Sequence, residues 1–188
     1  MVETTFLGDL RSYLATRVVT WAHAIFVAAV AAIAAWSTPT MLNVILLVVE
    51  LRLWDDLTDR ALDRNVVPRR VIAHTLHSRA FIQLTAALGA INLAIAASLG
   101  RGPLLIFTGI HLLLAVIYHP RRQGLEARAT VERYLVLGKY PAILALALQS
   151  NGHAKFFAAS AWLGAMFSAA CIYEYLTTPK RSPHALVK

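Results

Sequence analysis

The sequence predicts an all-α fold, a polytopic transmembrane helical bundle of about six helices that forms one domain over residues 1–188. Hydrophobic residues make up 58% of the chain and charged residues only 15%, whereas a soluble domain carries about a quarter charged residues. The charges also come in blocks between long apolar stretches, whereas a helix at a soluble surface mixes apolar and charged residues along its length. Shortage and segregation of charge together indicate a membrane protein.

Six apolar stretches are expected to form this bundle: residues 18–36, 41–54, 77–99, 103–118, 132–149 and 154–177. The first is longer than the apolar core of a signal peptide, which has about 7–15 residues, so we expect it to be a retained helix. Turn-forming sequences separate the members of each consecutive pair, namely Ser37 to Pro39, Gly100 to Pro103 and Ser150 to Gly152. The segments are therefore expected to form three helical hairpins.

The second stretch is short for a membrane span. At about 1.5 Å per residue, residues 41–54 reach about 21 Å, against a hydrocarbon core of about 30 Å. The helix is therefore expected to continue into the sequence WDDLTDRALDR, residues 54–64, and to bury part of it. Glu50 and Arg52 lie inside the stretch and are expected to face the bundle interior, because charges exposed to lipid are costly.

Basic residues determine the expected orientation. They are concentrated before the first segment, after the second and fourth segments and in the tail, whereas the opposite connections hold only Arg101 and Lys155. This bias places both termini and both long loops in the cytoplasm, and a prokaryotic cytoplasmic membrane is the expected location. Because these loops account for the net charge of +8, we infer no nucleic-acid partner. Membrane lipid is expected around the helices.

Four aspartates follow the second segment. On a continuous helix Asp56, Asp59 and Asp63 share one face, and Asp55 lies four residues before Asp59. Like charges at this spacing repel one another, and burial increases the cost. Two ways of neutralising them remain open. One is ion pairing with the interspersed arginines, and the other is a Mg²⁺ ion, which prefers carboxylate oxygens together with substrate phosphates.

Basic and tyrosine side chains near both cytoplasmic loops favour a phosphate ligand. Arg64 follows the aspartates, and Tyr118, Arg122 and Lys139 lie on or beside the second loop. Arginine binds phosphate oxygens through paired hydrogen bonds. Carboxylates, a metal and guanidinium groups at the mouth of an apolar bundle are the components of a diphosphate site. An apolar cavity behind such a site suits a long lipid tail.

The aspartate stretch resembles the first motif of the UbiA superfamily of intramembrane prenyltransferases, N/D-D-x-x-D-x-x-x-D followed by Arg. The match runs from Asp55, where Asn is more usual, to Arg64, and it follows the second helix as in the family. Tyr118-His119-Pro120-Arg121-Arg122 resembles the family's Y-x-x-x-K element, with Arg122 in place of Lys. The helix that contains Gly138-Lys139-Tyr140-Pro141 stands where the family's fifth helix does.

The resemblance implies that Mg²⁺ assists the ionisation of an allylic isoprenoid diphosphate and that an acceptor attacks the resulting carbocation. Asp56 and Asp59 are the residues expected to be essential for this catalysis. The residues that the resemblance assigns to the metal are Asp55, Asp56, Asp59 and Asp63, and those that it assigns to the diphosphate are Arg64, Tyr118, Arg122 and Lys139.

The sequence also departs from the family pattern. The family has nine helices and a second motif, D-x-x-x-D, after the sixth, whereas Glu174 is the only acid at the corresponding place here. Glu174 is therefore the candidate for part of a second metal site, and a homo-oligomer or a larger membrane complex could close the cavity. Two functions remain open: a Mg²⁺-dependent prenyltransferase, and a catalytically silent UbiA-like subunit that packs within a larger membrane protein complex.

Two polar residues inside apolar stretches are expected to hold helices together. His111 has no second metal ligand at helical spacing, so it is expected to form a hydrogen bond at a helix contact rather than to bind a metal. Asn92 is expected to form a hydrogen bond across helices for the same reason.

Overall fold

The structure is a computed structural model that describes residues 5–34, 37–66, 70–122, 131–150 and 156–177. Within these ranges all regular elements are helices. Their bounds are α1 Phe6–Tyr13, η1 Leu14–Val18, α2 Trp21–Ala34, α3 Thr38–Thr58, α4 Arg60–Val66, α5 Val71–His74, α6 Ser78–Leu99, α7 Arg101–Arg122, α8 Val131–Leu137, α9 Lys139–Ser150 and α10 Phe156–Thr177. The prediction of an all-helical chain is confirmed over this part of the sequence.

Helices coincide with all six expected apolar segments, in the order α2, α3, α6, α7, α8 with α9, and α10. By length and composition, two of them, α6 and residues 101–118 of α7, are candidates to cross a membrane. A third candidate is the pair formed by residues 6–18 and residues 21–32, which is bent by 67°. The chain is therefore a helical protein with two or three candidate membrane-spanning helices.

The fifth expected segment is divided, which corrects the prediction of one continuous helix. α8 ends at Leu137, and the N–H of Gly138 donates to the carbonyl of Leu135 over 3.0 Å before α9 begins. Pro141 lies in the first turn of α9, where its missing N–H has no helical partner to lose. The break makes Lys139 the first residue of α9, and this residue is buried.

α3 continues beyond the apolar stretch, as its short length predicts. The hydroxyl of Ser37 accepts a hydrogen bond from the N–H of Thr40 and caps the start of the helix. α3 then runs to Thr58, so that Asp55 and Asp56 lie buried in its last turn. Asp59 is the C-cap residue that follows α3, and Asp63 belongs to the separate helix α4. The assumption that all four aspartates share the face of one helix is therefore wrong.

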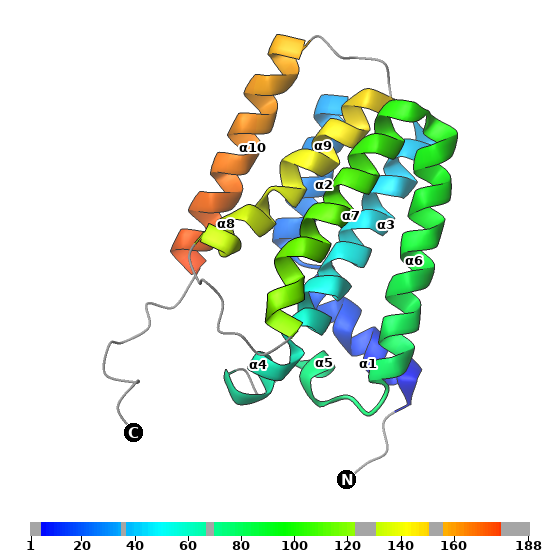
Figure 1. The fold of residues 1–188 in the computed structure, drawn as a ribbon, viewed down its shortest axis with the longest axis vertical. Coiled ribbons are helices and arrows are strands. Elements are labelled where there is room, and N and C mark those ends of the chain that lie inside the picture. Colours follow the sequence, from blue (N-terminus) through cyan, green and yellow to red (C-terminus); the bar gives the residue numbers. More distant parts are fainter. Residues whose placement is uncertain (1–4, 35–36, 67–69, 123–130, 151–155, 178–188) are drawn as a thin grey trace.

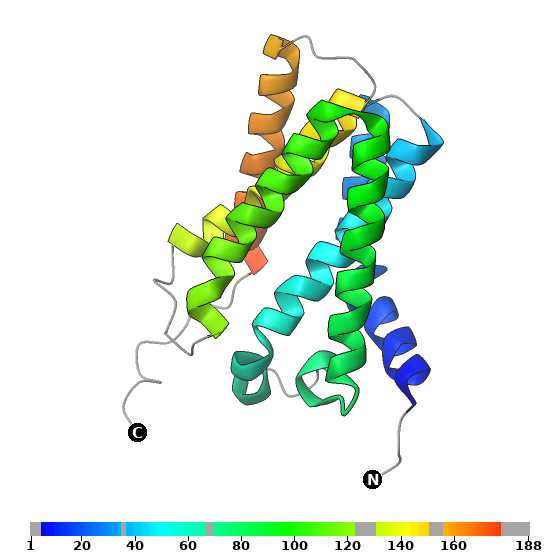
Figure 2. The same ribbon diagram turned by 45° about the vertical axis from the view of Figure 1, so that its right-hand side comes forward.

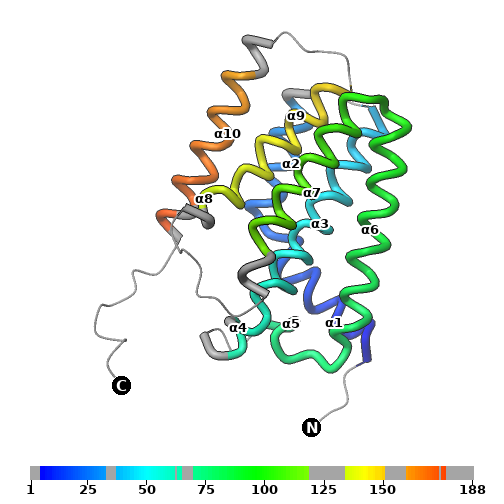
Figure 3. The backbone as a smooth tube through the Cα atoms, in the orientation of Figure 1, coloured from blue at the N-terminus to red at the C-terminus, as the bar shows by residue number. Residues whose placement is uncertain are grey.

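The long helices form a bundle in which α3 packs against α6, α7 lies between α6 and α9, and α10 packs on the outside against α9 (Figure 1). The backbone trace shows that α3 starts at the same end of the bundle as the α6–α7 turn and ends beside α4 (Figure 3). A core of buried apolar side chains joins α3, α7 and α9, and it includes Leu47, Leu51, Leu114, Leu144 and Leu146.

The first helix lies across the other end of the bundle. α1 packs beside the start of α6 (Figure 2). There the ring of Phe81 packs edge to face against two rings of α1. Its centroid lies 5.3 Å from that of Phe6 and 5.8 Å from that of Tyr13. The hydroxyl of Thr75, next to α5, donates to the carboxylate of Asp9 on α1. These contacts hold α1 and η1 against the end of α3 that carries the aspartates.

Candidate functional site

Asp56 is neutralised by two arginines and a tyrosine. Nη2 of Arg17, on η1, lies 2.7 Å from Oδ1, and its Nε lies 3.1 Å from Oδ2. Nη2 of Arg52, one turn earlier on α3, lies 3.3 Å from Oδ1. The hydroxyl of Tyr13 donates to Oδ2 over 3.0 Å. The Asp56 side chain is only 5% exposed, so its charge depends on these partners rather than on water.

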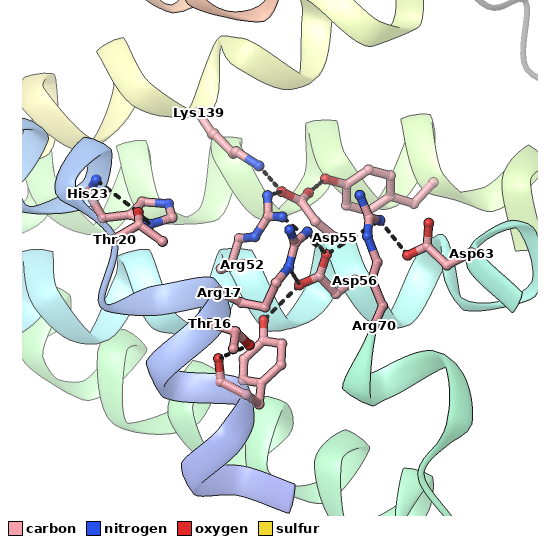
Figure 4. A network of polar contacts seen from close by, with 12 residues as sticks. Thr16, Arg17, Thr20, His23, Arg52, Asp55, Asp56, Asp63, Arg70 and Lys139 are labelled. Atoms are coloured by element: carbon pink, nitrogen blue, oxygen red, sulfur yellow. Dashed lines mark hydrogen bonds and ion pairs between the residues drawn. The ribbon is translucent and has the colours of Figure 1, made fainter. Parts of the chain in front are cut away.

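Asp55 points toward the second half of the chain (Figure 4). The Nζ of Lys139, at the start of α9, forms an ion pair with Oδ2, and the hydroxyl of Tyr118, on α7, donates to Oδ1. Arg52 Nη1 lies 4.0 Å from Oδ2. The two adjacent aspartates therefore bind α3 to different partners: Asp56 to the N-terminal helices, and Asp55 to α7 and α9.

Asp63 and Arg70 extend the same network toward α4 and α5. Arg70 forms an ion pair with Asp63, and its Nη1 also lies 4.0 Å from Oδ1 of Asp56. The arginines of α4 bind main-chain carbonyls: Arg60 donates to Thr75 over 3.2 Å, and Arg64 donates to Ala73 over 2.8 Å. Burial and the charge of Arg64 lower the pKa of Arg60, yet a guanidinium remains charged in proteins.

We call these residues the ion-pair cluster. Among the described residues, its ion pairs join the carboxylates of Asp55, Asp56 and Asp63 to the cations of Arg17, Arg52, Arg70 and Lys139. Three negative charges thus face four positive charges. The side chains of Arg17 and Arg70 keep 23% and 28% of their exposure, so the cluster is reached by water at its edge. Such a site has the electrostatics to accept an anion.

The carboxylates suit Mg²⁺ by type but are not arranged around a common point. Carboxylate oxygens are the protein ligands that Mg²⁺ prefers, and Asp55 and Asp56 supply four of them side by side. Over the described part of the chain, however, no group of three His, Cys, Asp or Glu side chains is placed to hold a metal ion. The oxygens face cations instead. The donor set therefore fits the ion chemically, and binding it requires cations to move aside.

The structure brings together some of the residues that the sequence singles out. Asp55, Asp56, Tyr118 and Lys139 are in direct contact or share a partner. Asp63 joins them through Arg70, and Asp59 lies half-buried where α3 meets α4.

Of the three remaining candidates, only Arg64 has a described side chain, and that side chain does not join this contact network. Arg64 is exposed and bonds to the carbonyl of Ala73. The side chains of Arg122 and Glu174 lie outside the described residues.

Tyr13 and Arg17 are site residues that sequence reasoning missed. In the sequence, Arg17 counts only among the basic residues before the first apolar segment that predict orientation, and no motif singles out Tyr13. The two residues could have been found from their spacing of four, just before the first apolar segment, because this spacing places both side chains on one side of a helix. The spacing identifies the shared side but not its partner, because Asp56 lies 39 residues after Arg17.

An apolar groove lies beside the ion-pair cluster, between α7 and α9. Its volume is about 260 Å³. Gly109 on α7 and Gly138 at the break before α9 line this groove and have no side chains to fill it. Lys139 also lines the groove. The remaining lining residues are Ile106, Ile110, Leu113, Leu114 and Ala142.

A second polar group lies deeper in the bundle, and we call it the interior network. His111 Nε2 lies 2.6 Å from Oε1 of Glu50, and Asn92 Nδ2 donates to Oε2 over 2.7 Å. Asn43 Nδ2 donates to the main-chain carbonyl of Asn92 over 3.2 Å. The predictions that His111 forms a hydrogen bond at a helix contact and that Asn92 bonds across helices are both confirmed.

The fold and the site define a helical protein with two or three candidate membrane-spanning helices and a buried cluster of ion pairs at one end. Comparison with protein families, with curated proteins and with solved structures found no match for this chain.

Proposed function

We propose that this chain is a multi-pass protein of a prokaryotic cytoplasmic membrane, with six membrane segments and both termini in the cytoplasm. The six helical segments agree with the apolar stretches of the sequence, and α6 and α7 have 22 residues each, which at about 1.5 Å per residue is enough to cross a bilayer. The concentration of basic residues on one set of connections supports the orientation.

We propose further that the ion-pair cluster binds an isoprenoid diphosphate together with Mg²⁺. The observation that carries this proposal is the excess of cations over carboxylates in the cluster, next to an apolar groove that has Lys139 at its edge. An anion with an apolar tail matches both features. An anion without an apolar tail would match the positive charge of the cluster but would not occupy the groove.

The ion pairs of the cluster can be exchanged without leaving a charge unpaired. In this proposal Arg17, Arg52 and Lys139 would bind phosphate oxygens, and the carboxylates that they release would hold Mg²⁺. Each ion pair that breaks would be replaced by a cation–phosphate contact and a carboxylate–metal contact. This matters because a buried charge that loses its partner without replacement costs about 3–5 kcal/mol. The present pairs thus keep the aspartates in place for the ligand.

In this proposal the metal supplies neutralisation of the charge that develops on the leaving diphosphate. The remaining roles fall to the chain: Tyr118 orients the diphosphate, and the apolar walls of the groove keep water from the allylic carbon. The residues proposed to hold Mg²⁺ are Asp55, Asp56, Asp59 and Asp63, with Glu174 for a second ion. Those proposed to bind the diphosphate are Arg64, Tyr118, Arg122 and Lys139, together with Arg17 and Arg52 of the cluster. Transfer of the prenyl group to an acceptor completes the proposed reaction.

Binding and turnover of a labelled isoprenoid diphosphate by the purified protein in detergent test this proposal. Asp56→Asn with Asp59→Asn is expected to abolish Mg²⁺-dependent binding and the release of diphosphate. Asp9→Asn is the matched control, because Asp9 is a buried aspartate bonded to Thr75 outside the cluster. Binding that persists in EDTA, or in the double variant, would contradict the assignment.

The second candidate function is a catalytically silent subunit of a larger membrane protein complex. It is favoured by one observation, namely that Asp55, Asp56 and Asp63 each already have a cationic partner. In that case the cluster fastens η1, α3, α4 and α9 and the start of α5 together. This function predicts co-purification with specific membrane subunits in fixed stoichiometry and no affinity of the isolated chain for isoprenoid diphosphate with Mg²⁺. Turnover by the isolated chain excludes it.

A further inference from the structure

The interior network contains a carboxyl group and an imidazole that touch inside the bundle. The Glu50 side chain is 3% exposed and the His111 side chain 21% exposed. Their contact joins α3 to α7, and Asn92 adds α6. The ring of His111 is also stacked on Phe107 with centroids 4.0 Å apart, which fixes its orientation. Neither the resemblance nor the proposed diphosphate site uses these residues.

The hydrogen bonds determine how many protons this pair holds. Nδ1 of His111 lies 2.8 Å from the carbonyl oxygen of Phe107. A carbonyl oxygen only accepts, so Nδ1 carries a hydrogen in either charge state. Nε2 faces Oε1 of Glu50 over 2.6 Å, and a bond at this distance requires one proton between the two atoms. The proton resides on Glu50 in a neutral pair or on His111 in an ion pair, and in both cases the net charge is zero.

The surroundings favour retention of this proton. Asn92 donates to the other carboxyl oxygen of Glu50, so its own amide oxygen points elsewhere. Within the described part of the chain, the buried amide oxygens of Asn43 and Asn92 accept no hydrogen bond. The network thus already contains two acceptors without a donor. Removing the shared proton would add a buried carboxylate and would take away the donor between Glu50 and His111, which is costly.

Among the residues that the structure describes, no other charge takes the place of the proton. On α3 the next charged residue is Arg52, which is paired with Asp55 and Asp56. On α6 the charged residue is Arg79, at the start of the helix. On the described part of α9 it is Lys139, which is paired with Asp55. On α7, His111 itself is the titratable group facing Glu50, and Tyr118 donates to Asp55.

We infer that Glu50 and His111 form a proton-binding site in the interior of the bundle, which holds one shared proton at pH values where a free imidazole has lost its own. This inference does not depend on the diphosphate site. In the unfolded chain at about pH 7–8, free Glu and His together hold much less than one proton on these positions, because an unperturbed His releases it near pH 6.5. The folded chain therefore binds more protons than the unfolded chain, and the difference approaches one near pH 8, so its stability falls as the pH rises over this range.

Glu50→Gln is the variant that tests the site. The Gln amide N–H can donate to Nε2 of a neutral His111, while its carbonyl oxygen accepts from Asn92, so the contacts persist without an exchangeable proton. We expect the unfolding midpoint of the wild type in detergent to fall between about pH 7 and about pH 8, and that of Glu50→Gln to fall measurably less. His23→Gln is the control, because it removes another half-buried histidine, on α2, and is expected to keep the wild-type fall.

Infrared and ¹⁵N NMR spectra of the wild type give an answer that does not depend on a variant folding. At about pH 8 we expect either the carbonyl band of a protonated carboxylic acid or the ¹⁵N signal of an imidazolium at His111. Loss of that signal in Glu50→Gln supports the inference. A carboxylate together with a neutral imidazole in the wild type at this pH, or identical pH profiles of the wild type and Glu50→Gln, would overturn it.

Discussion

The ion-pair cluster and the interior network are both buried and polar, yet they are built differently. The cluster joins side chains from η1, α3, α4, α7 and α9 and from Arg70 just before α5, with three carboxylates against four cations and water at its edge. The interior network joins only α3, α6 and α7 and is electrically neutral, because one proton is shared between Glu50 and His111. The first is held by charges that can change partners, and the second by hydrogen bonds that cannot.

This difference separates two kinds of task. A cluster with surplus positive charge and several interchangeable partners can accept an anion and return to its former pairs when the anion leaves. A neutral network has nothing to exchange with a charged ligand except its proton. Polar groups inside a membrane protein are commonly functional, and here the two groups are suited to different ligands. They lie on the same helix, since Glu50 is five residues before Asp55.

Removal of one carboxylate from the cluster is expected to have the largest effect on stability. Asp56→Ala leaves Arg17 without its described ion pair and Arg52 with only the longer contact to Asp55. The loss of a partner from a buried ion pair costs about 3–5 kcal/mol, and partial exposure of Arg17 places the expected value near the lower limit. Denaturant titration in detergent micelles measures the free energy of unfolding. A loss below that of Tyr13→Phe would show that the pairs do not stabilise the fold.

Crowding of the interior network is expected to have an intermediate effect. A Cβ at position 89 would lie 2.9 Å from Oε1 of Glu50, and Glu50 cannot withdraw because Asn92 and His111 hold both its oxygens. Gly89→Ala should therefore cost about 1–3 kcal/mol of unfolding free energy. Gly109→Ala is the matched control: nothing lies within 4 Å of its Cβ, so the helix propensity of Ala is expected to stabilise it by up to about 1 kcal/mol. Equal effects of the two changes would contradict the rigidity of the network.

Removal of a single neutral donor from the cluster is expected to have the smallest effect. Tyr13→Phe deletes the hydroxyl that donates to Asp56 over 3.0 Å, while the arginines continue to neutralise the carboxylate. The expected loss is about 1.5 kcal/mol, the lower end of the range for a hydrogen bond to a charged group. The same change in an Asp56→Asn background should cost less, and the difference is the coupling energy of the pair. Strict additivity would mean that the hydroxyl acts elsewhere.

Local patterns were sufficient for the helices and for some buried polar residues. Apolar runs placed all six expected segments on helices, and the shortness of residues 41–54 predicted that α3 continues through Asp55 and Asp56. The same reasoning failed at Asp59 and Gly138, where helices end inside segments expected to be continuous. Helix ends depend on a few hydrogen bonds and on how the next segment packs, so periodicity alone does not determine them.

The sequence by itself determined that this chain is helical and apolar, that carboxylates occur where an apolar helix ends, and that Asn92 and His111 need partners. Only the tertiary structure determined which residues those partners are. Asp56 binds Arg17 from 39 residues away, Asp55 binds Lys139 from 84 residues away, and Glu50 binds His111 from 61 residues away. The physical reason is that a buried charge needs a partner within about 4 Å, and residues so far apart in the chain come within that distance only through helix packing.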